Sequence, residues 1–490
     1  MRPERVVNAR DLRGVVHVTS AVARRRRSAR EAALARVVDA GLLGPEAPLV
    51  GLLDVDGIRD SVDALTAAFG DTPVLHTFAA KACGLVPVLR LLAETGMGCE
   101  VASPGELEQA LAAGFTPERL VLDSPAKTVE ELRYALAHGI AVNVDNFQEL
   151  ARVDAILAEG PAAGPIGIRV NPQVGAGAIG AMSTATTTSK FGIALRDPGA
   201  VEAVVDAFAR RPWLNRLHAH VGSQGCPLSL IAAGLRATFD LAEHINTVLG
   251  RRQITGLDIG GGLPVNFDGD EDDPTFADYV AELRATVPEL LDGRYRLVTE
   301  FGRSLLAKNG TIASLVEYTK SAGGRRIAIT HAGAQVATRT VFMPQAWPLR
   351  VGAFDAHGRP KDAPNEIQDI AGPCCFAGDL TAVGRALPLL DPGDVVALYD
   401  TGAYYFSSHF AYNSLPRPAV YGYRVVDDDV RLATVREAQT IREVVQESGA
   451  PHVHALVDLI SPKSSGNSSD DGRDGRDDRD DPSHPEEVAV

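Results

Sequence analysis

The segment from Leu75 to Ala82 places a lysine, Lys81, directly after a short apolar run that predicts a buried strand. A lysine in this position is energetically costly unless its ammonium finds a counter-charge or loses its proton. A lysine that loses its proton readily can form an imine with a carbonyl cofactor. For Lys81 taken alone, a strand-end lysine that extends its ammonium into solvent is the better explanation, so a chemical role needs support from elsewhere in the chain.

Further residues with chemical potential also follow predicted strands. They are His220, the consecutive glycines Gly260, Gly261 and Gly262, the carboxylate Glu300, and Arg303. Consecutive glycines let backbone N–H groups approach a phosphate closely, and an arginine offers a forked donor to phosphate oxygens. A glutamate can keep a pyridine nitrogen protonated, and a histidine can stack on an aromatic ring.

Each of these residues also has a purely structural explanation. A tight turn explains the glycines, an ion pair explains Glu300 with Arg303, and a satisfied core histidine explains His220. Their common placement after different strands is harder to explain in this way. It favours one site for an aromatic aldehyde that carries a phosphate.

The elements that position these residues alternate between short apolar strands and helical segments from about residue 48 to 310. The predicted strands are Leu49–Leu53, Val74–Phe78, Leu120–Leu122, Ala141–Val144, Ile166–Val170, Leu217–Val221, Gly256–Ile259 and Leu297–Thr299. Eight strands alternating with helices favour an α/β fold of the (β/α)8 barrel type, whose strands point their carboxyl ends at the active-site face. A doubly wound open sheet is the competing architecture.

Four regions are predicted along the chain. Residues 1–47 form a partly helical N-terminal extension, residues 48–310 the barrel, residues 311–460 a mostly antiparallel β domain, and residues 461–490 a disordered acidic tail. The extension contains the basic run Arg24–Arg27. This run could bind nucleic acid or act as a targeting signal, but Glu31 and Asp39 follow it, which favours a solvated helix face.

Composition excludes several classes of protein. Of the 490 residues, 45% are hydrophobic and 23% charged, which is ordinary for a globular protein. The net charge of -15 gives no indication of a nucleic-acid surface, and the apolar runs are too short to span a membrane. The five cysteines form no CxxC pair and no zinc spacing, so we expect no metal site and a reducing, cytoplasmic location.

The ordered motifs together resemble those of the fold-type III pyridoxal-phosphate decarboxylases. This group includes the diaminopimelate, ornithine and arginine decarboxylases, with alanine racemase as a distant relative, and the closest likeness is to diaminopimelate decarboxylase. The matching segments are Phe78–Ala82, Cys99–Leu107, Asn143–Leu150, Arg169–Pro172, Ser189–Gly192, His218–Gln224, Asp258–Pro264, Glu300–Ser304, Gly372–Cys375 and Gly402–Tyr404. The likeness implies an alanine-racemase-like barrel followed by a β domain, with pyridoxal 5'-phosphate as cofactor.

The resemblance also implies a role for each matching residue. Lys81 matches the lysine that forms the imine, His220 the histidine stacked on the cofactor ring, and Glu300 the partner of the pyridine nitrogen. The residues of this chain that match the family's phosphate contacts are Ser223, Gly261, Gly262, Arg303 and Tyr404. Cys375 matches a cysteine that reaches the active site of a second subunit and delivers a proton. The likeness therefore implies a homodimer with shared active sites and an amino-acid substrate.

The departures from the family pattern concern the substrate. Phe376 follows Cys375 where diaminopimelate decarboxylases usually carry a glutamate, and Met343 stands in place of a tyrosine. An aromatic ring can contact a distal ammonium only through a weaker cation–π interaction. Arg339 could still bind a substrate carboxylate and Asp379 a substrate amine. The family default, meso-diaminopimelate converted to L-lysine and CO2, stays open beside lysine, ornithine or a secondary-metabolite precursor.

Three other functions compete with decarboxylation. An amino-acid racemase on the same scaffold would need a second base, typically a tyrosine, opposite the lysine, whereas Cys375 favours a decarboxylase. A non-enzymatic regulator would not need Lys81 and Glu300, and both are present. A dinucleotide-binding dehydrogenase is disfavoured because no Gly-x-Gly-x-x-Gly follows an early strand.

Overall fold

A computed structural model describes residues 20–460, and the predicted acidic tail lies outside them. The chain divides into two compact units after Gln439. The second unit contains the helices α12 (Ile441–Glu447) and α13 (Ala455–Ile460). None of the described helices is long and apolar enough to cross a lipid bilayer.

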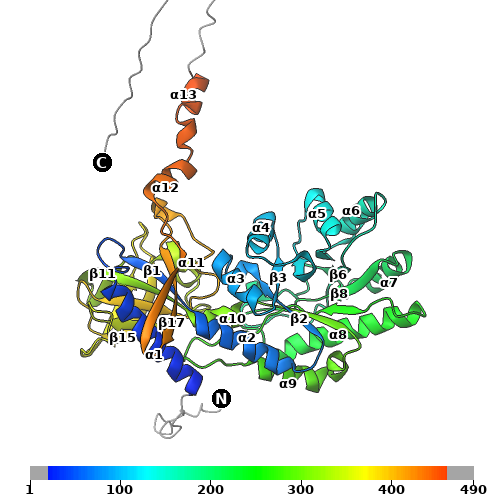
Figure 1. The fold of residues 1–490 in the computed structure, drawn as a ribbon, viewed down its shortest axis with the longest axis horizontal. Helices are drawn as coiled ribbons and strands as arrows, with labels where there is room; N and C mark the ends of the chain where they lie inside the picture. The colour runs from blue at the N-terminus through cyan, green and yellow to red at the C-terminus, as the bar shows by residue number, and fades with distance from the viewer. Residues whose placement is uncertain (1–19, 461–490) are drawn as a thin grey trace, which may run out of the picture. The chain divides into compact units, whose positions relative to one another are not determined.

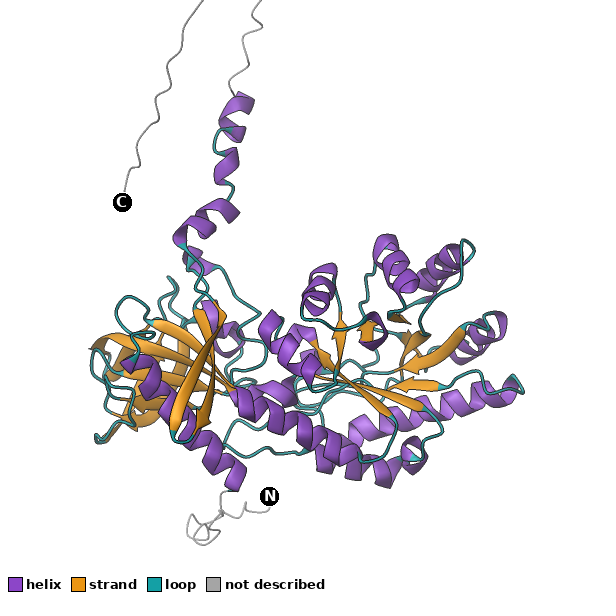
Figure 2. Ribbon diagram, viewed as in Figure 1, coloured by secondary structure: helices purple, strands orange, loops and turns teal. Residues whose placement is uncertain are grey.

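The first unit contains a closed parallel barrel of eight strands, which confirms the predicted fold class (Figures 1 and 2). In barrel order the strands are β2 (Val74–Ala79), β3 (Gly98–Val101), β4 (Leu120–Leu122), β5 (Ala141–Val144), β6 (Ile166–Asn171), β8 (Leu214–His218), β9 (Gly256–Asp258) and β10 (Arg296–Phe301). The barrel closes where β10 pairs with β2, with Glu300 opposite Thr77. Each pairing is parallel, so all carboxyl ends meet at one face.

Helices connect these strands and surround the barrel, as Figure 2 shows. They are α2 (Val55–Phe69), α3 (Val86–Glu94), α4 (Pro104–Ala112), α5 (Val129–His138), α6 (Phe147–Leu157), α7 (Ala200–Arg210), α8 (Leu228–Val248) and α9 (Phe276–Thr286). Local sequence fixes several helix starts: Thr128 and Glu131 form a capping box at α5, and the side chain of Ser103 caps α4. The strands are buried on both faces, as is typical of parallel sheets covered by helices.

The second sheet is mostly antiparallel and is continuous through β15-β14-β12-β11-β1-β17-β18, with β13 and β16 beside it. Its strands are β1 (Leu49–Asp54), β11 (Gly310–Ala322), β12 (Arg325–Thr330), β13 (Val351–Phe354), β14 (Asn365–Ala371), β15 (Leu380–Pro388), β16 (Val395–Tyr399), β17 (Ala419–Val426) and β18 (Asp429–Arg436). The helix α11 (Ala334–Phe342) packs against β15. A β domain therefore follows the barrel, as we predicted from the sequence.

The predicted set of barrel strands was wrong in two respects. β1 pairs with β11 and β17 in the second sheet, and β3 completes the barrel instead. Both mistakes have a simple cause. β1 is an apolar run, and burial alone does not distinguish the two sheets. β3 has only four residues and carries Glu100 in its middle, so it does not look like a buried strand.

The predicted solvated face of the N-terminal helix was also partly wrong. In α1 (Ala21–Asp39), Arg24 and Arg27 are exposed, but Arg26 is buried at 2% relative exposure. Its guanidinium bonds the backbone oxygen of Asp270 and the carboxylate of Asp272. These partners come from a loop far away in sequence, and the nearby acidic residues on the same helix gave no indication of them.

Candidate active site

Lys81 lies in a single 3-10 turn that follows β2, at the carboxyl end of the barrel. Its Nζ donates to the Glu100 Oε2 of β3 at 2.7 Å, and Glu100 is fully buried. Burial lowers the pKa of Lys81, but the charge of Glu100, with smaller contributions from Tyr404 and Glu300, raises it above its usual value overall. Lys81 is thus an ammonium here, contrary to the expected easily deprotonated amine, and Glu100 is the group placed to take its proton.

Two histidines and Glu300 form a second group inside the barrel mouth. The Glu300 Oε2 lies 3.6 Å from the His218 Nε2 and 3.6 Å from the His220 Nδ1. Burial, reinforced by Glu100 and Asp123, raises the pKa of Glu300 well above its usual value. Burial lowers the pKa of His220 to about 3, so its imidazole is neutral at physiological pH. A neutral ring is suited to stacking on a heteroaromatic ligand.

The atom Glu300 Oε1 is buried and has no hydrogen-bond partner among residues 20–460. An unpartnered buried carboxylate oxygen is costly, and a ligand N–H would satisfy it. A bound cation beside Glu300 would also favour its ionised form. This atom therefore fits a protonated pyridine nitrogen.

The glycine turn after β9 comes closer to neighbouring backbone than any side chain permits. A Cβ on Gly261 would lie 2.2 Å from the Glu300 carbonyl oxygen, and one on Gly262 would lie 2.0 Å from the Gly222 oxygen. Gly262 also has a φ of +104°, which L-residues rarely adopt. The Gly261 N–H contacts the His220 Nδ1 at 3.3 Å, so the turn and the histidine are held together. Ser223 lies in the loop that follows His220, where its N–H bonds the Met182 oxygen.

Two arginines stack on the ring of Tyr404. Their guanidinium carbons lie 4.5 Å (Arg303) and 4.3 Å (Arg339) from the ring centroid, and both also lie over Trp347. The atoms Arg303 Nε and Arg339 Nη1 are buried and have no hydrogen-bond partner in the described part of the chain. Burial lowers the pKa of Arg303 to about 10, with a smaller contribution from Arg339. Two adjacent cations with unused donors fit an anion.

Tyr404 joins this arginine pair to the lysine turn. Its φ is +69°, which is unusual for a tyrosine, and its N–H donates to the Ala82 oxygen at 2.6 Å. Such backbone strain is typical of functional sites. The β domain therefore contributes to the candidate site directly beside Lys81.

Cys375 and Phe376 do not contact Lys81, His220 or Glu300 in the described part of the chain. Among the residues that the structure describes, no hydrogen bond, ion pair or ring contact joins either of them to Lys81, His220 or Glu300. Cys375 is exposed, and its N–H bonds the Asn413 side chain at 2.8 Å.

Asp379 lies under this exposed loop and is buried. Its two carboxylate oxygens accept the backbone N–H groups of Ala334 and Cys374, each at 2.6 Å. A carboxylate held in this way fixes the loop of Cys375 to the start of α11.

Sequence reasoning missed several residues of the site. They are Glu100, Asp123, Arg169, His218 and Trp347. Asp123 binds the Arg169 Nη1 at 2.9 Å and lies 3.6 Å from the His218 Nδ1. One signal was available: residues two apart on a strand share a face, so His218 points the same way as His220. Trp347 lies in a loop and left no such signal.

The residues present fit pyridoxal 5'-phosphate. The lysine amine matches its aldehyde, and the buried Glu300 oxygen matches its ring nitrogen. The neutral imidazole matches its ring face. The glycine cradle and the two arginines with unused donors match its phosphate. Comparisons with known proteins agree. Residues 55–307 match the family described as pyridoxal-dependent decarboxylase, pyridoxal binding domain. This chain belongs to the pyridoxal-dependent decarboxylases.

Individual relatives support the family assignment. The chain is 35% identical to diaminopimelate decarboxylase of Pseudomonas aeruginosa, covering 79% of this chain and 90% of that protein. It is 30% identical to the Methanothermobacter thermautotrophicus diaminopimelate decarboxylase, covering 82% and 91%. The crystal structure of Helicobacter pylori diaminopimelate decarboxylase complexed with L-lysine superposes with a TM-score of 0.70 at 26% identity, covering 82% of this chain and 97% of that one.

Proposed function

We propose that this decarboxylase removes the α-carboxylate of an amino acid with pyridoxal 5'-phosphate attached to Lys81. The observation that carries the proposal is the convergence of unused polar atoms on one barrel mouth, from Glu300 Oε1 to Arg303 Nε. When bound, the cofactor supplies an electron sink for the electrons left after CO2 departs. The default substrate is meso-diaminopimelate, after the named relatives, with L-lysine as product.

The protein residues have distinct tasks in this proposal. Glu100 accepts a proton from Lys81 so that the amine becomes nucleophilic. Glu300 holds the proton on the ring nitrogen, and His220 covers one ring face. The glycine turn at Gly261 and Gly262, with Ser223, Tyr404 and Arg303, holds the phosphate.

We further propose that Cys375 acts in the site of a second copy of the chain. Its exposed position, away from the Lys81 group, supports this assignment. There it would return a proton to Cα after CO2 leaves. Asp379 would act by holding the Cys375 loop in place, because both of its oxygens already bind backbone amides.

The five free cysteines support a reducing, cytoplasmic location.

The surroundings of Cys375 point to altered recognition of the distal end of the substrate. Phe376 belongs to an aromatic cluster formed by Phe342, Phe376, Phe410 and Tyr412, in which Phe342 and Phe376 stack with centroids 5.5 Å apart. Phe342 is 56% exposed and Phe410 37%. A charged distal ammonium placed against these rings would find no carboxylate from Phe376. We propose that the enzyme has only a weak preference for substrates that carry a distal ammonium over those that lack it.

The direct test is to incubate the purified holoenzyme with a panel of amino acids, including meso-diaminopimelate, L-lysine, L-ornithine and D-2-aminopimelate. We expect CO2 release from at least one long-chain amino acid. Chiral analysis of the recovered amino acid separates decarboxylation from racemisation. Racemised substrate without CO2 would contradict the proposed function.

A substitution tests the distal pocket. Phe376→Glu would restore a carboxylate and should raise kcat/KM for meso-diaminopimelate relative to D-2-aminopimelate by at least about tenfold, since one charge-assisted hydrogen bond contributes about 1.5–3 kcal/mol. Phe376→Gln, of nearly the same size but neutral, is the matched control and should change the ratio little. An unchanged ratio in Phe376→Glu would place Phe376 outside the substrate pocket.

A further inference from the structure

An ionic network with two buried carboxylates links the N-terminal helix to two loops of the candidate cofactor site. It consists of Arg27, Arg30, Asp270, Arg350 and Asp400. The Asp270 carboxylate accepts bonds from Arg27 Nε at 3.0 Å, Arg30 Nη2 at 3.0 Å and Arg350 Nη1 at 2.8 Å. Arg350 also binds both oxygens of Asp400, at 2.8 and 2.9 Å. Arg350 is therefore the one residue in the network that joins the two carboxylates.

The two carboxylates belong to chain segments that lead to the phosphate contacts. Asp270 lies in the loop that follows the glycine turn ending at Gly262. Asp400 begins the turn that leads to Tyr404, and it has a φ of +62°. Both carboxylates are buried. Arg350 thus connects the segments that deliver the glycine cradle and the tyrosine.

Further contacts hold the loop of Asp270 from its other side. Lys308 Nζ donates to the backbone oxygens of Asn266 and Gly269 at 2.6 and 2.8 Å, and it lies 3.4 Å from Asp400. The side chain of Gln224 bonds both backbone groups of Val265, so the loop after His220 is tied to the same segment. Every loop proposed to contact the phosphate, apart from the one that carries Arg303, therefore meets this network or its immediate neighbours.

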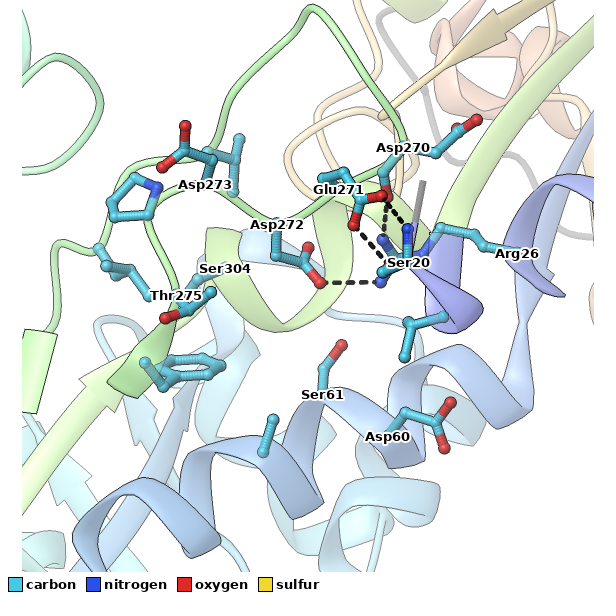
Figure 3. A pocket seen from close by; sticks show the side chains of 16 residues that line it. Ser20, Arg26, Asp60, Ser61, Asp270, Glu271, Asp272, Asp273, Thr275 and Ser304 are labelled. Carbon is cyan, nitrogen blue, oxygen red and sulfur yellow. Dashed lines mark hydrogen bonds and ion pairs between the residues drawn. The ribbon is translucent and has the colours of Figure 1, made fainter. Parts of the chain in front are cut away.

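The N-terminal helix α1 makes further contacts with the loop that carries Asp270. Figure 3 shows Arg26 of α1 directed at Asp270 and Asp272 beside a cavity of about 310 Å³, and Ser20 bonded to Glu271. The described lining of this cavity includes none of Lys81, His220, Glu300 and Arg303. The contact between α1 and the loop of Asp270 therefore lies outside the reaction site. It can affect that site only by changing where the loop is held.

A buried ion pair contributes little net stability, but removal of one partner leaves an uncompensated charge and a loop free to move. The charges of Arg30 and Arg350 hold the pKa of Asp270 below its usual range, against the effect of its own burial. Among the described residues, neutralising Arg350 would leave Asp400 with only the Lys308 ammonium near its carboxylate, because the bidentate pair would be gone.

We propose that Arg350 is a positioning residue for the cofactor phosphate, holding the glycine-turn loop and the Tyr404 turn in register, with α1 as the outer support of the network. The proposal rests on the proposed cofactor site. Its consequence is that the N-terminal helix, although remote from the reacting atoms, helps to determine cofactor affinity.

The test measures cofactor binding rather than turnover. Full-length wild type, Arg350→Gln, Arg350→Lys and Arg25→Gln are depleted of cofactor and titrated with pyridoxal 5'-phosphate by absorbance, and the melting temperature is recorded with and without cofactor. Arg25→Gln is the matched control, since it removes one charge from α1 that pairs with Asp54 and Asp60 instead.

We expect Arg350→Gln to raise the dissociation constant about tenfold, as loss of outer-shell support does in other sites. It should also reduce the rise in melting temperature on cofactor addition. Arg350→Lys keeps the charge without the bidentate geometry and should fall between Arg350→Gln and wild type. Arg25→Gln should stay within about twofold of wild type. A purely structural role would lower the melting temperature of the depleted protein and leave the dissociation constant unchanged.

Two results would overturn the proposal: a folded Arg350→Gln with wild-type affinity, or an equal loss in Arg25→Gln. If Arg350→Gln does not fold, Arg27→Gln replaces it, because Arg27 is 56% exposed and makes one bond to the network. Wild-type affinity in Arg27→Gln would then contradict the role of α1 and the network. A wild-type chain that binds no cofactor would instead contradict the proposed function.

Discussion

At the scale of single residues, the candidate site is built from charges in mutual contact, most of them buried; the Lys81 side chain is 43% exposed. Glu100 balances Lys81, Arg169 balances Asp123, and Glu300 lies against two neutral histidines. Burial of so many ionisable groups in one barrel mouth is typical of an active site, because it shifts their pKa values away from the ordinary range. The pKa of Glu300 is raised, and the cofactor nitrogen would supply the missing partner.

The role of Glu300 can be tested by Glu300→Gln. The amide can still accept a hydrogen bond but carries no charge to keep the ring nitrogen protonated. We expect kcat to fall by about two orders of magnitude, in the range seen when one preorganised electrostatic contact is lost, while cofactor still attaches to Lys81. Steady-state kinetics with an absorbance spectrum checks both points. A kcat within twofold of wild type would contradict the assignment.

The sequence predicted the residues whose chemistry is unusual for their position, and it missed their partners. Lys81, His220, Glu300 and Arg303 each follow an apolar run, so their polar character was visible. Glu100 was hidden because its strand is only four residues long, and Trp347 because loop positions have no periodicity. The raised pKa of Lys81 could not be predicted either, since it depends on a contact between neighbouring strands.

At the scale of elements, the loop of Cys375 is held by one buried carboxylate. Asp379→Ala would leave the N–H groups of Ala334 and Cys374 without acceptors. We expect a loss of about 3 kcal/mol in the free energy of unfolding, from two charge-assisted bonds. Denaturant unfolding measures it, with Asp379→Asn as the milder control, because an amide keeps one acceptor. Equal stability of Asp379→Ala and wild type would contradict the role in holding the loop.

The pairing of β2 with β10 carries a pH dependence. His76 of β2 contacts Thr299 of β10 at 2.9 Å through Nδ1, and burial lowers its pKa to about 4. The folded protein therefore binds fewer protons at His76 than the unfolded chain between about pH 4 and its ordinary pKa of 6.5. The contribution of His76 to stability is complete above pH 6.5 and is lost progressively as the pH falls toward 4.

This dependence can be isolated with His76→Gln. Between pH 7 and pH 4.5 the wild type should lose roughly 2 kcal/mol more stability than the variant, from about 1.4 kcal/mol per pKa unit. Denaturant unfolding at the two pH values gives the difference, and groups common to both proteins cancel. Parallel losses in both proteins would show that His76 does not titrate in this way.

At the scale of the whole molecule, the candidate site draws on both parts of the first unit. The barrel supplies Lys81, His220 and Glu300, and the β domain supplies Tyr404 and Arg339. The fold class followed from alternating strands and helices, but the place of β1 in the second sheet did not, because its pairing with β11 and β17 joins distant segments. In the aromatic cluster beside Cys375, Phe342 and Phe410 are exposed, which supports the proposed contact with another copy of the chain.

The proposed shared site predicts complementation between inactive variants. Lys81→Ala and Cys375→Ala should each have little activity alone. Mixed and allowed to exchange subunits, they should recover about a quarter of wild-type activity, since half of the dimers are mixed and each carries one intact site. No recovery, under conditions where subunit exchange is verified by a tagged copy, would place Cys375 in the site of its own chain.

The most direct measurement is to identify the lysine that carries the cofactor. The holoenzyme is reduced with borohydride, which fixes the carbon–nitrogen bond, and is then digested and mapped by mass spectrometry. We expect the pyridoxyl group on Lys81, with no labelled peptide in Lys81→Ala treated in parallel. Labelling of a different lysine, or equal labelling of Lys81→Ala, would contradict this prediction.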